Sequence, residues 1–300
     1  MSIKAPMKAP SKVLEDSQLS ALHYPVVGSP KLDGFRCVID GEPKTSSMKS
    51  WPNPYIKDYL SQSQFHGLDG EILVGLPNSI DAFHNTSGPV RRHYGEPDFK
   101  LYVFDDWTKG DEVYQVRWLD NYSIPTDDRI VLLQQKILYT PEEVIAFDNE
   151  MLKIGYEGAM IRSLTGIYKD KRCSLNEQII LKRKPFVECE AQVVKVLEGK
   201  QNNNEAKMNE AGQMRRGYSA ANMIPNGTFG SFVLRANPWE ETFSSGLGLG
   251  FTAEDKQKVW NNREDYIGRI VTIKYQKYGS RDAPRIPSVI KIRPKWDLSA

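Results

Sequence analysis

The sequence predicts an α+β protein of two domains, the second of which is a small β-barrel. Residues 141–153 carry a helix-start signal, because Thr140 can cap the first turn, Pro141 follows it, and two glutamates come next. Short stretches rich in β-branched and aromatic residues predict strands at 35–40, 70–74, 100–104, 159–162 and 178–182. Further alternating stretches at 191–197, 229–235, 268–275 and 289–292 predict the barrel.

The connecting segments are interpreted from their composition. Residues 14–22 and 56–60 are expected to be helical. The composition changes after the segment 181–186, and we expect a hinge at 185–190 and domains spanning 1–187 and 188–300. Residues 199–227 are polar and include three consecutive asparagines, which predicts a long loop.

The composition is typical of an ordinary soluble globular protein, with 40% hydrophobic and 26% charged residues. No apolar run approaches the ~20 residues that span a bilayer, and the first eleven residues lack the apolar centre of a signal peptide. Three widely spaced cysteines (Cys37, Cys173 and Cys189) indicate neither a disulfide framework nor a zinc site. We therefore expect a monomeric cytoplasmic protein without a membrane partner, located in the host cytoplasm if the source is viral.

Positive charge is concentrated near the C-terminus, although the net charge of the chain is only +2. Residues 263–295 contain nine basic and three acidic residues, with tyrosines between them and Trp296 directly after them. A polyanion partner would explain this segment through contacts with phosphates. A solvated strand face would give the same pattern.

The segment 31–36, KLDGFR, places an amine, a carboxylate, a glycine and a guanidinium close together. The amine of Lys31 can act as a covalent nucleophile once it loses its proton, and Arg36 can hold a phosphate or ribose oxygen. A surface turn with a solvated lysine would have the same sequence, so this segment alone decides nothing. Four further short segments follow it: LDGEIL at 68–73, LYVFD at 101–105, EGAMIR at 157–162 and LKRKPF at 181–186.

In this order the five segments resemble the motifs of covalent nucleotidyltransferases, which are DNA ligases, RNA ligases and mRNA capping enzymes. Two others, AFHNTSGPVRR at 82–92 and RIPSVIKIR at 285–293, resemble segments of small ATP-dependent DNA ligases from tailed phages. NEA at 204–206 and NEAG at 209–212 resemble another stretch of those enzymes. The resemblance implies a nucleotidyltransferase domain, ATP-grasp-like and built of antiparallel sheets and helices, followed by an OB-fold barrel.

The resemblance also implies an activity. Lys31 would attack ATP with Mg²⁺ present, the AMP would pass to the 5′-phosphate of a nick in duplex DNA, and the 3′-hydroxyl would then displace AMP. Each step collects negative charge on phosphoryl oxygens, so cations and in-line positioning would supply the catalysis. Such an enzyme would serve DNA replication, repair and recombination.

Roles for individual residues follow from the resemblance. Lys182 and Lys184 would neutralise the α-phosphate and disfavour the charged form of Lys31 by like-charge repulsion. Carboxylate oxygens suit Mg²⁺, so Glu157 and Asp33 are the expected metal ligands. The other expected nucleotide contacts are Ser29 at the base edge, Arg36 and Glu71 at the ribose, Phe104 on the adenine ring, and Arg285 and Arg293 at the pyrophosphate.

One departure from the family pattern concerns the nick. After the first strand these ligases usually have Ser-Arg, whose arginine holds the 5′-phosphate, whereas Ser46 stands at the arginine position here. A hydroxyl cannot replace a bidentate guanidinium. The candidates to replace it are Lys49, Arg91 and Arg92. Two further DNA contacts are expected at Arg215 and Arg216, and Lys295 is the counterpart of the lysine that ends the last motif.

Two alternatives remain open at this stage. An RNA ligase or a capping-type nucleotidyltransferase shares the covalent lysine, and the segments at 82–92 and 285–293 favour a DNA ligase over both. A catalytically inactive homologue that only binds nucleic acid is a protein of a different class. The intact set of Lys31, Glu71, Glu157, Lys182 and Lys184 argues against it, because a binding module needs no such set.

Overall fold

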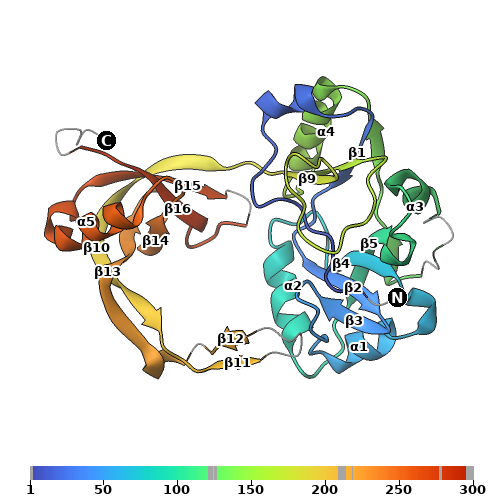
Figure 1. The fold of residues 1–300 in the computed structure, drawn as a ribbon, viewed down its shortest axis with the longest axis horizontal. Helices are drawn as coiled ribbons and strands as arrows, with labels where there is room; N and C mark the ends of the chain where they lie inside the picture. Colours follow the sequence, from blue (N-terminus) through green and yellow to red (C-terminus); the bar gives the residue numbers. More distant parts are fainter. Residues whose placement is uncertain are drawn as a thin grey trace. The chain divides into compact units, whose positions relative to one another are not determined.

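The computed structural model of the chain describes residues 3–120, 124, 127–208, 214–217, 219–276 and 279–294 (Figure 1). The chain divides into two compact units, Met1–Lys184 and Pro185–Ala300. Both units combine strands with a few helices, and the second contains a closed barrel. The predicted α+β class is therefore confirmed.

Four strands form the first sheet of the first unit, in the order β7-β1-β8-β9. They are β1 (Val26–Pro30), β7 (Lys136–Leu138), β8 (Ala159–Ser163) and β9 (Ile180–Arg183), all paired antiparallel. Ser29 of β1 is paired with Met160 of β8, and Met160 is paired with Lys182 of β9. Directly opposed residues share one face of a sheet, so these three side chains form a row.

Five strands form the second sheet, in the order β3-β2-β4-β5-β6. They are β2 (Phe35–Asp40), β3 (Glu42–Thr45), β4 (Leu68–Val74), β5 (Phe99–Asp106) and β6 (Ile130–Leu132), with β6 parallel to β5. Arg36 is paired with Glu71, and Glu71 with Tyr102. Phe104 packs in one cluster with Tyr102, so both rings lie on the same side of β5.

Helices of the first unit pack on these sheets. They are α1 (Pro54–Leu60), α2 (Ala82–Arg91), α3 (Tyr114–Asp120) and α4 (Pro141–Lys153), with 3₁₀ turns at Asp16–Ala21, Ser63–Phe65 and Trp107–Lys109. Helix α4 begins as predicted, because the Thr140 hydroxyl accepts a hydrogen bond from the Glu143 amide at 3.2 Å. Its Phe147 packs with Leu138, Ile161 and Leu181 of the first sheet. The predicted helix at 14–22 is only a 3₁₀ turn.

The second unit contains a closed barrel with the strand order β10-β13-β14-β16-β15. Its strands are β10 (Val187–Asn202), β13 (Met223–Arg235), β14 (Phe243–Leu247), β15 (Ile270–Gln276) and β16 (Arg285–Ile292). Helix α5 (Ala253–Asn261) and two 3₁₀ turns, Ala220–Asn222 and Arg263–Tyr266, complete the unit. Phe232, Leu234, Val271, Ile273 and Val289 fill its core.

The predicted loop at 199–227 is wrong for most of its length. Strand β10 continues to Asn202 and pairs there with Met223 of β13, and β11 (Ala206–Met208) pairs with β12 (Met214–Arg216). Most described side chains of this ribbon are exposed, so no apolar alternation marks it as strand. The NEAG segment at 209–212 and Lys295, the expected counterpart of the last motif's lysine, lie outside the described residues.

Candidate active site

All five motif segments meet at one cavity of about 260 Å³ in the first unit. The lining residues are Lys8, Ala9, Ser29, Pro30, Lys31, Leu32, Arg36, Glu71, Phe104, Leu133, Met160, Arg162, Arg172, Ile180, Lys182 and Lys184. A larger hollow of about 440 Å³ adjoins it through Pro30 and Leu133, but Lys136 is the only cation in its lining. The smaller cavity therefore has the chemistry of an anion site.

Lys31 directly follows β1 and is fixed through its backbone. Its amide donates to the carbonyl of Gly158 at 2.8 Å, and its carbonyl accepts from the amide of Glu157 at 3.2 Å. Gly158 has φ +139°, and a Cβ there would lie 2.3 Å from the carbonyl oxygen of Arg183. Only glycine fits that position, so the segment that carries Glu157 can lie against both Lys31 and the end of β9.

The amine of Lys31 forms an ion pair with Oε2 of Glu157, which is almost fully buried. The other carboxylate oxygen, Oε1, lies 3.5 Å from Nζ of Lys184. Glu157 thus bridges the predicted nucleophile and a predicted phosphate ligand. A carboxylate in contact with the amine is also placed to accept its proton.

Lys182 loses its proton more readily than an exposed lysine does. Burial, followed by the positive charges of Lys184 and Lys31, lowers the pKa of Lys182 to about 8. An anion bound in the cavity would raise this pKa again, because its negative charge favours the ammonium form of Lys182 and offsets the repulsion from the neighbouring cations. The row from Ser29 through Met160 therefore ends in a cation suited to a phosphate.

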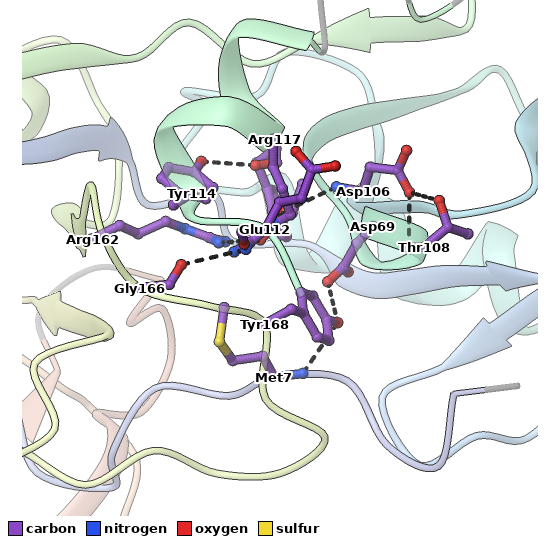
Figure 2. A network of polar contacts seen from close by, with 12 residues as sticks. Met7, Asp69, Asp106, Thr108, Glu112, Tyr114, Arg117, Arg162, Gly166 and Tyr168 are labelled. Carbon is purple, nitrogen blue, oxygen red and sulfur yellow. Dashed lines mark hydrogen bonds and ion pairs between the residues drawn. The ribbon is translucent and has the colours of Figure 1, made fainter. Parts of the chain in front are cut away.

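Arg36 reaches the cavity, but its guanidinium is held by Asp69, a residue not singled out from the sequence. Nε and Nη2 of Arg36 lie 2.5 and 2.6 Å from the two carboxylate oxygens of Asp69. The hydroxyl of Tyr168 donates to the same carboxylate at 2.7 Å and accepts from the amide of Met7 at 3.2 Å (Figure 2). The buried carboxylate of Asp69 therefore connects Arg36 of β2 with Tyr168, and Tyr168 connects it with the N-terminal segment at Met7.

A second buried carboxylate supports the wall of the cavity. Asp105 accepts from Nε of Arg117 at 2.8 Å and from Nη1 of Arg162 at 2.7 Å. Figure 2 labels the two arginines. The guanidinium carbon of Arg162 lies 5.0 Å from the ring centre of Phe104, and that of Arg36 lies 4.7 Å from it. The network thus sets the position of Phe104.

Glu71 is the only carboxylate that lines the cavity. Burial raises its pKa to about 7, against the opposing effect of Arg36 and Lys31. A carboxyl in this state can be converted to its charged form by small changes in its surroundings, such as an added cation.

The raised pKa of Glu71 predicts a pH-dependent stability. Its folded pKa is above the unfolded value, so its contribution is fully present below about pH 4.5 and is lost as the pH rises through about 7. Between pH 6 and 8 the wild type should lose on the order of 1 kcal/mol relative to Glu71→Gln, which cannot ionise. Urea unfolding at both pH values measures this. Glu150→Gln, on the exposed side of α4, is the control, and equal losses in the wild type and Glu71→Gln would contradict the prediction.

The other predicted residues of the first unit do not line the cavity. Asp33 is buried and does not line the cavity. In the first unit Lys49, Arg91 and Arg92 are exposed, and the guanidinium of Arg91 lies over the ring of Phe35.

Four predicted basic residues belong to the second unit. Arg285 and Arg293 are partly buried, and Arg293 forms an ion pair with Glu190. Arg216 donates to the carbonyl of Asn204 at 2.8 Å. Arg215 lies in β12, but its side chain is outside the described part of the structure.

The expected Mg²⁺ site has few carboxylate oxygens available to it. Among the described residues, no group of three or more histidine, cysteine or acidic side chains could hold a metal ion. Glu157 supplies carboxylate oxygens at the cavity beside Lys31. That donor set fits an ion such as Mg²⁺, which takes most of its ligands from phosphates and water and only one or two from protein.

Comparison with known proteins agrees with this arrangement. A family model of the DNA ligase OB-like domain matches residues 224–293. A structure of Chlorella virus DNA ligase-adenylate is 26% identical, with 97% of this chain and 100% of that chain covered and a TM-score of 0.54. A second structure of that ligase-adenylate is 27% identical, with 98% and 99% covered and a TM-score of 0.53.

More distant likeness shows the fold alone. A structure from the Lig E DNA ligases is 20% identical, with 95% of this chain and 98% of that chain covered and a TM-score of 0.67. No curated protein sequence matches the chain. None of the described helices is both long enough and apolar enough to cross a membrane.

The fold and the cavity define a nucleotidyltransferase unit joined to an OB-type barrel. The predicted resemblance to ATP-dependent DNA ligases is confirmed, and these findings support an enzyme of that kind.

Proposed function

We propose that this protein seals 3′-hydroxyl/5′-phosphate nicks in duplex DNA, with ATP as the source of AMP. The observation that carries the proposal is the single cavity where Lys31 meets Glu157, Lys182 and Lys184. A reactive amine surrounded by phosphate-binding cations is what lysine adenylylation requires. The ligase-adenylate structures share this fold over nearly the whole chain.

The chemistry follows from the side chains present. Nζ of Lys31 attacks the α-phosphorus of ATP, its proton passes to Glu157, and the bond to pyrophosphate breaks. The 5′-phosphate of the nick then attacks the same phosphorus and releases Lys31. Finally the 3′-hydroxyl attacks the activated 5′-phosphate and AMP departs. Lys182 and Lys184 stabilise the charge on the phosphoryl oxygens throughout.

The remaining ligands keep their predicted roles. Ser29 and Phe104 would contact the adenine, and Arg36 and Glu71 the ribose. Glu157, with Asp33 two residues after Lys31, would hold Mg²⁺, which would supply charge neutralisation at the phosphates when bound. Nick sealing of this kind serves DNA replication, repair and recombination, and we propose a monomeric cytoplasmic enzyme.

Both units would supply DNA contacts. The predicted contact residues are Arg215 and Arg216 in the second unit and Lys49, Arg91 and Arg92 in the first. Described cations of the 263–295 segment include Arg269, Lys274 and Lys291 on or beside the barrel strands. Cations that meet phosphates give an affinity that falls with salt.

The proposal is tested by sealing of a labelled nick. The protein should join a nicked DNA duplex with ATP, but not with GTP. Joining of a nicked RNA duplex instead would favour an RNA ligase, and a GTP-dependent adduct would favour a capping-type enzyme. Duplex binding without any covalent AMP adduct would identify an inactive homologue.

Arg285 should act mainly in the first of the three steps. A cation is needed to stabilise departing pyrophosphate, and that charge develops only during lysine adenylylation. Arg285→Ala should therefore form the Lys31 adduct roughly 10- to 100-fold more slowly, yet seal nicks with much less impairment when purified already adenylylated. Single-turnover assays of both reactions measure this. Equal losses would place Arg285 on the DNA or in the barrel structure.

A further inference from the structure

The cavity holds more positive charge than its own carboxylates neutralise. Seven of its lining side chains are cationic, namely Lys8, Lys31, Arg36, Arg162, Arg172, Lys182 and Lys184, whereas Glu71 is the one acid among them. Buried carboxylates behind the wall pair with four of these cations. Asp69 holds Arg36, Asp105 holds Arg162, and Glu157 binds Lys31 and Lys184.

Lys8 and Arg172 are two further cations of this cavity, and their backbones are paired. Among the residues that the structure describes, neither forms an ion pair with a carboxylate. Backbone hydrogen bonds hold them together: the amide of Lys8 donates to Lys171, and the amide of Cys173 donates to the carbonyl of Lys8. Nη1 of Arg172 donates to the carbonyl of Ala9 at 2.8 Å.

The amine of Lys8 also reaches the turn that follows β3. Its Nζ donates to the carbonyl of Ser46 at 2.5 Å, and Ser46 is exposed. Burial, followed by the charges of Arg172 and Arg36, lowers the pKa of Lys8. The pKa of Lys182 is affected first by Lys184 and Lys31 among its charged neighbours and then by Arg172, so Arg172 acts on both Lys8 and Lys182. Lys8 therefore lies at the Ser46 side of the cavity rather than among the three lysines around Glu157.

We propose that Lys8 binds the 5′-phosphate of the nicked strand and so supplies the cation that Ser46 lacks. This rests on the proposed function, in which a second phosphate must lie beside the AMP phosphate during transfer. The lysines at Glu157 serve the first phosphate, and Lys8 with Arg172 offers a second anion site in the same cavity. The exposed turn at Ser46 gives a polynucleotide access to that site.

The other candidates are less well placed. Lys49, Arg91 and Arg92 are exposed and do not line the cavity. Lys8 alone combines contact with Ser46 and a place in the lining. Its origin in the N-terminal segment, far from the motifs, explains why the sequence did not indicate it.

The test separates the steps in the full-length protein. Wild type and Lys8→Ala are first adenylylated with ATP and then mixed with nicks that carry a 5′-phosphate or a 5′-hydroxyl. AMP transfer by Lys8→Ala should slow by about 10- to 100-fold, since a charge-assisted hydrogen bond to phosphate is lost. Its preference for binding the 5′-phosphate nick should fall, while adduct formation slows much less.

Controls keep the result interpretable. Lys4→Ala removes a neighbouring exposed lysine and should leave both steps unchanged. Lys8→Ala with Ser46→Arg should recover part of the transfer rate, because a guanidinium returns to the same place. Unchanged transfer in Lys8→Ala, or an equal loss in adduct formation, overturns the proposal, the latter by placing Lys8 on the ATP phosphates. Failure of the wild type to form an adduct would instead count against the proposed function.

Discussion

Replacement of Lys31 by alanine should abolish the covalent AMP adduct and all sealing that depends on ATP. The structure gives this lysine a carboxylate partner, Glu157, and a backbone fixed by Gly158. No other lysine of the cavity has both features. With the nucleophile removed, the first reaction has no alternative route and the loss should exceed the ~10⁴-fold range typical of losing a single catalytic acid or base.

The measurement is incubation with α-labelled ATP and Mg²⁺, followed by mapping of any acid-labile adduct. Lys31→Ala should show no label, whereas Lys153→Ala, on the exposed end of α4, should label like the wild type. Given a nick that already carries AMP on its 5′-phosphate, Lys31→Ala should retain some sealing, since that last step needs no lysyl adduct. Ligation by Lys31→Ala with ATP alone would show that another residue is the nucleophile.

The sequence predicts which motif segments meet at this cavity because each of them is a short local pattern. Strands 35–40 and 70–74 and helix 141–153 are set by local propensity and capping, and these carry or support the motifs. Bringing the motifs together required only their order along the chain. Lys31 and Glu157 are 126 residues apart, yet each lies in a motif that its own neighbouring residues identify.

Contacts that depend on three-dimensional packing could not be predicted in the same way. Asp69 and Asp105 stand inside recognised motifs, but nothing local shows that each neutralises a guanidinium from a distant segment. Lys8 is one basic residue in a lysine-rich N-terminus, and only its bond to Ser46 and its place in the cavity lining distinguish it from Lys4. The ribbon of β10 and β13 is not predictable from the sequence, because its exposed strands are paired by backbone groups, which have no side-chain signature.

Asp105 should be the most important of these hidden residues for stability. Its carboxylate and the Arg117 side chain are fully buried, and Arg162 is nearly so. Removing one partner of a buried ion pair leaves an uncompensated charge, and here two guanidiniums would lose their partner. Asp105→Ala should therefore lower the free energy of unfolding by about 3–5 kcal/mol.

Urea unfolding of the full chain, followed by circular dichroism, measures that loss, and the barrel unit provides an internal reference because Asp105 lies in the first unit.

The matched control is Asp106→Ala, whose carboxylate only caps the short turn at Thr108, so its loss should stay at about 1 kcal/mol. Asp105→Asn should fall near Asp105→Ala, since a neutral amide leaves both guanidiniums charged. A loss below 1 kcal/mol in both Asp105 variants would mean that water or other groups solvate Arg117 and Arg162. ATP-dependent labelling of Lys31 should also weaken in Asp105→Ala, because Arg162, which then lacks its carboxylate partner, contacts the ring of Phe104.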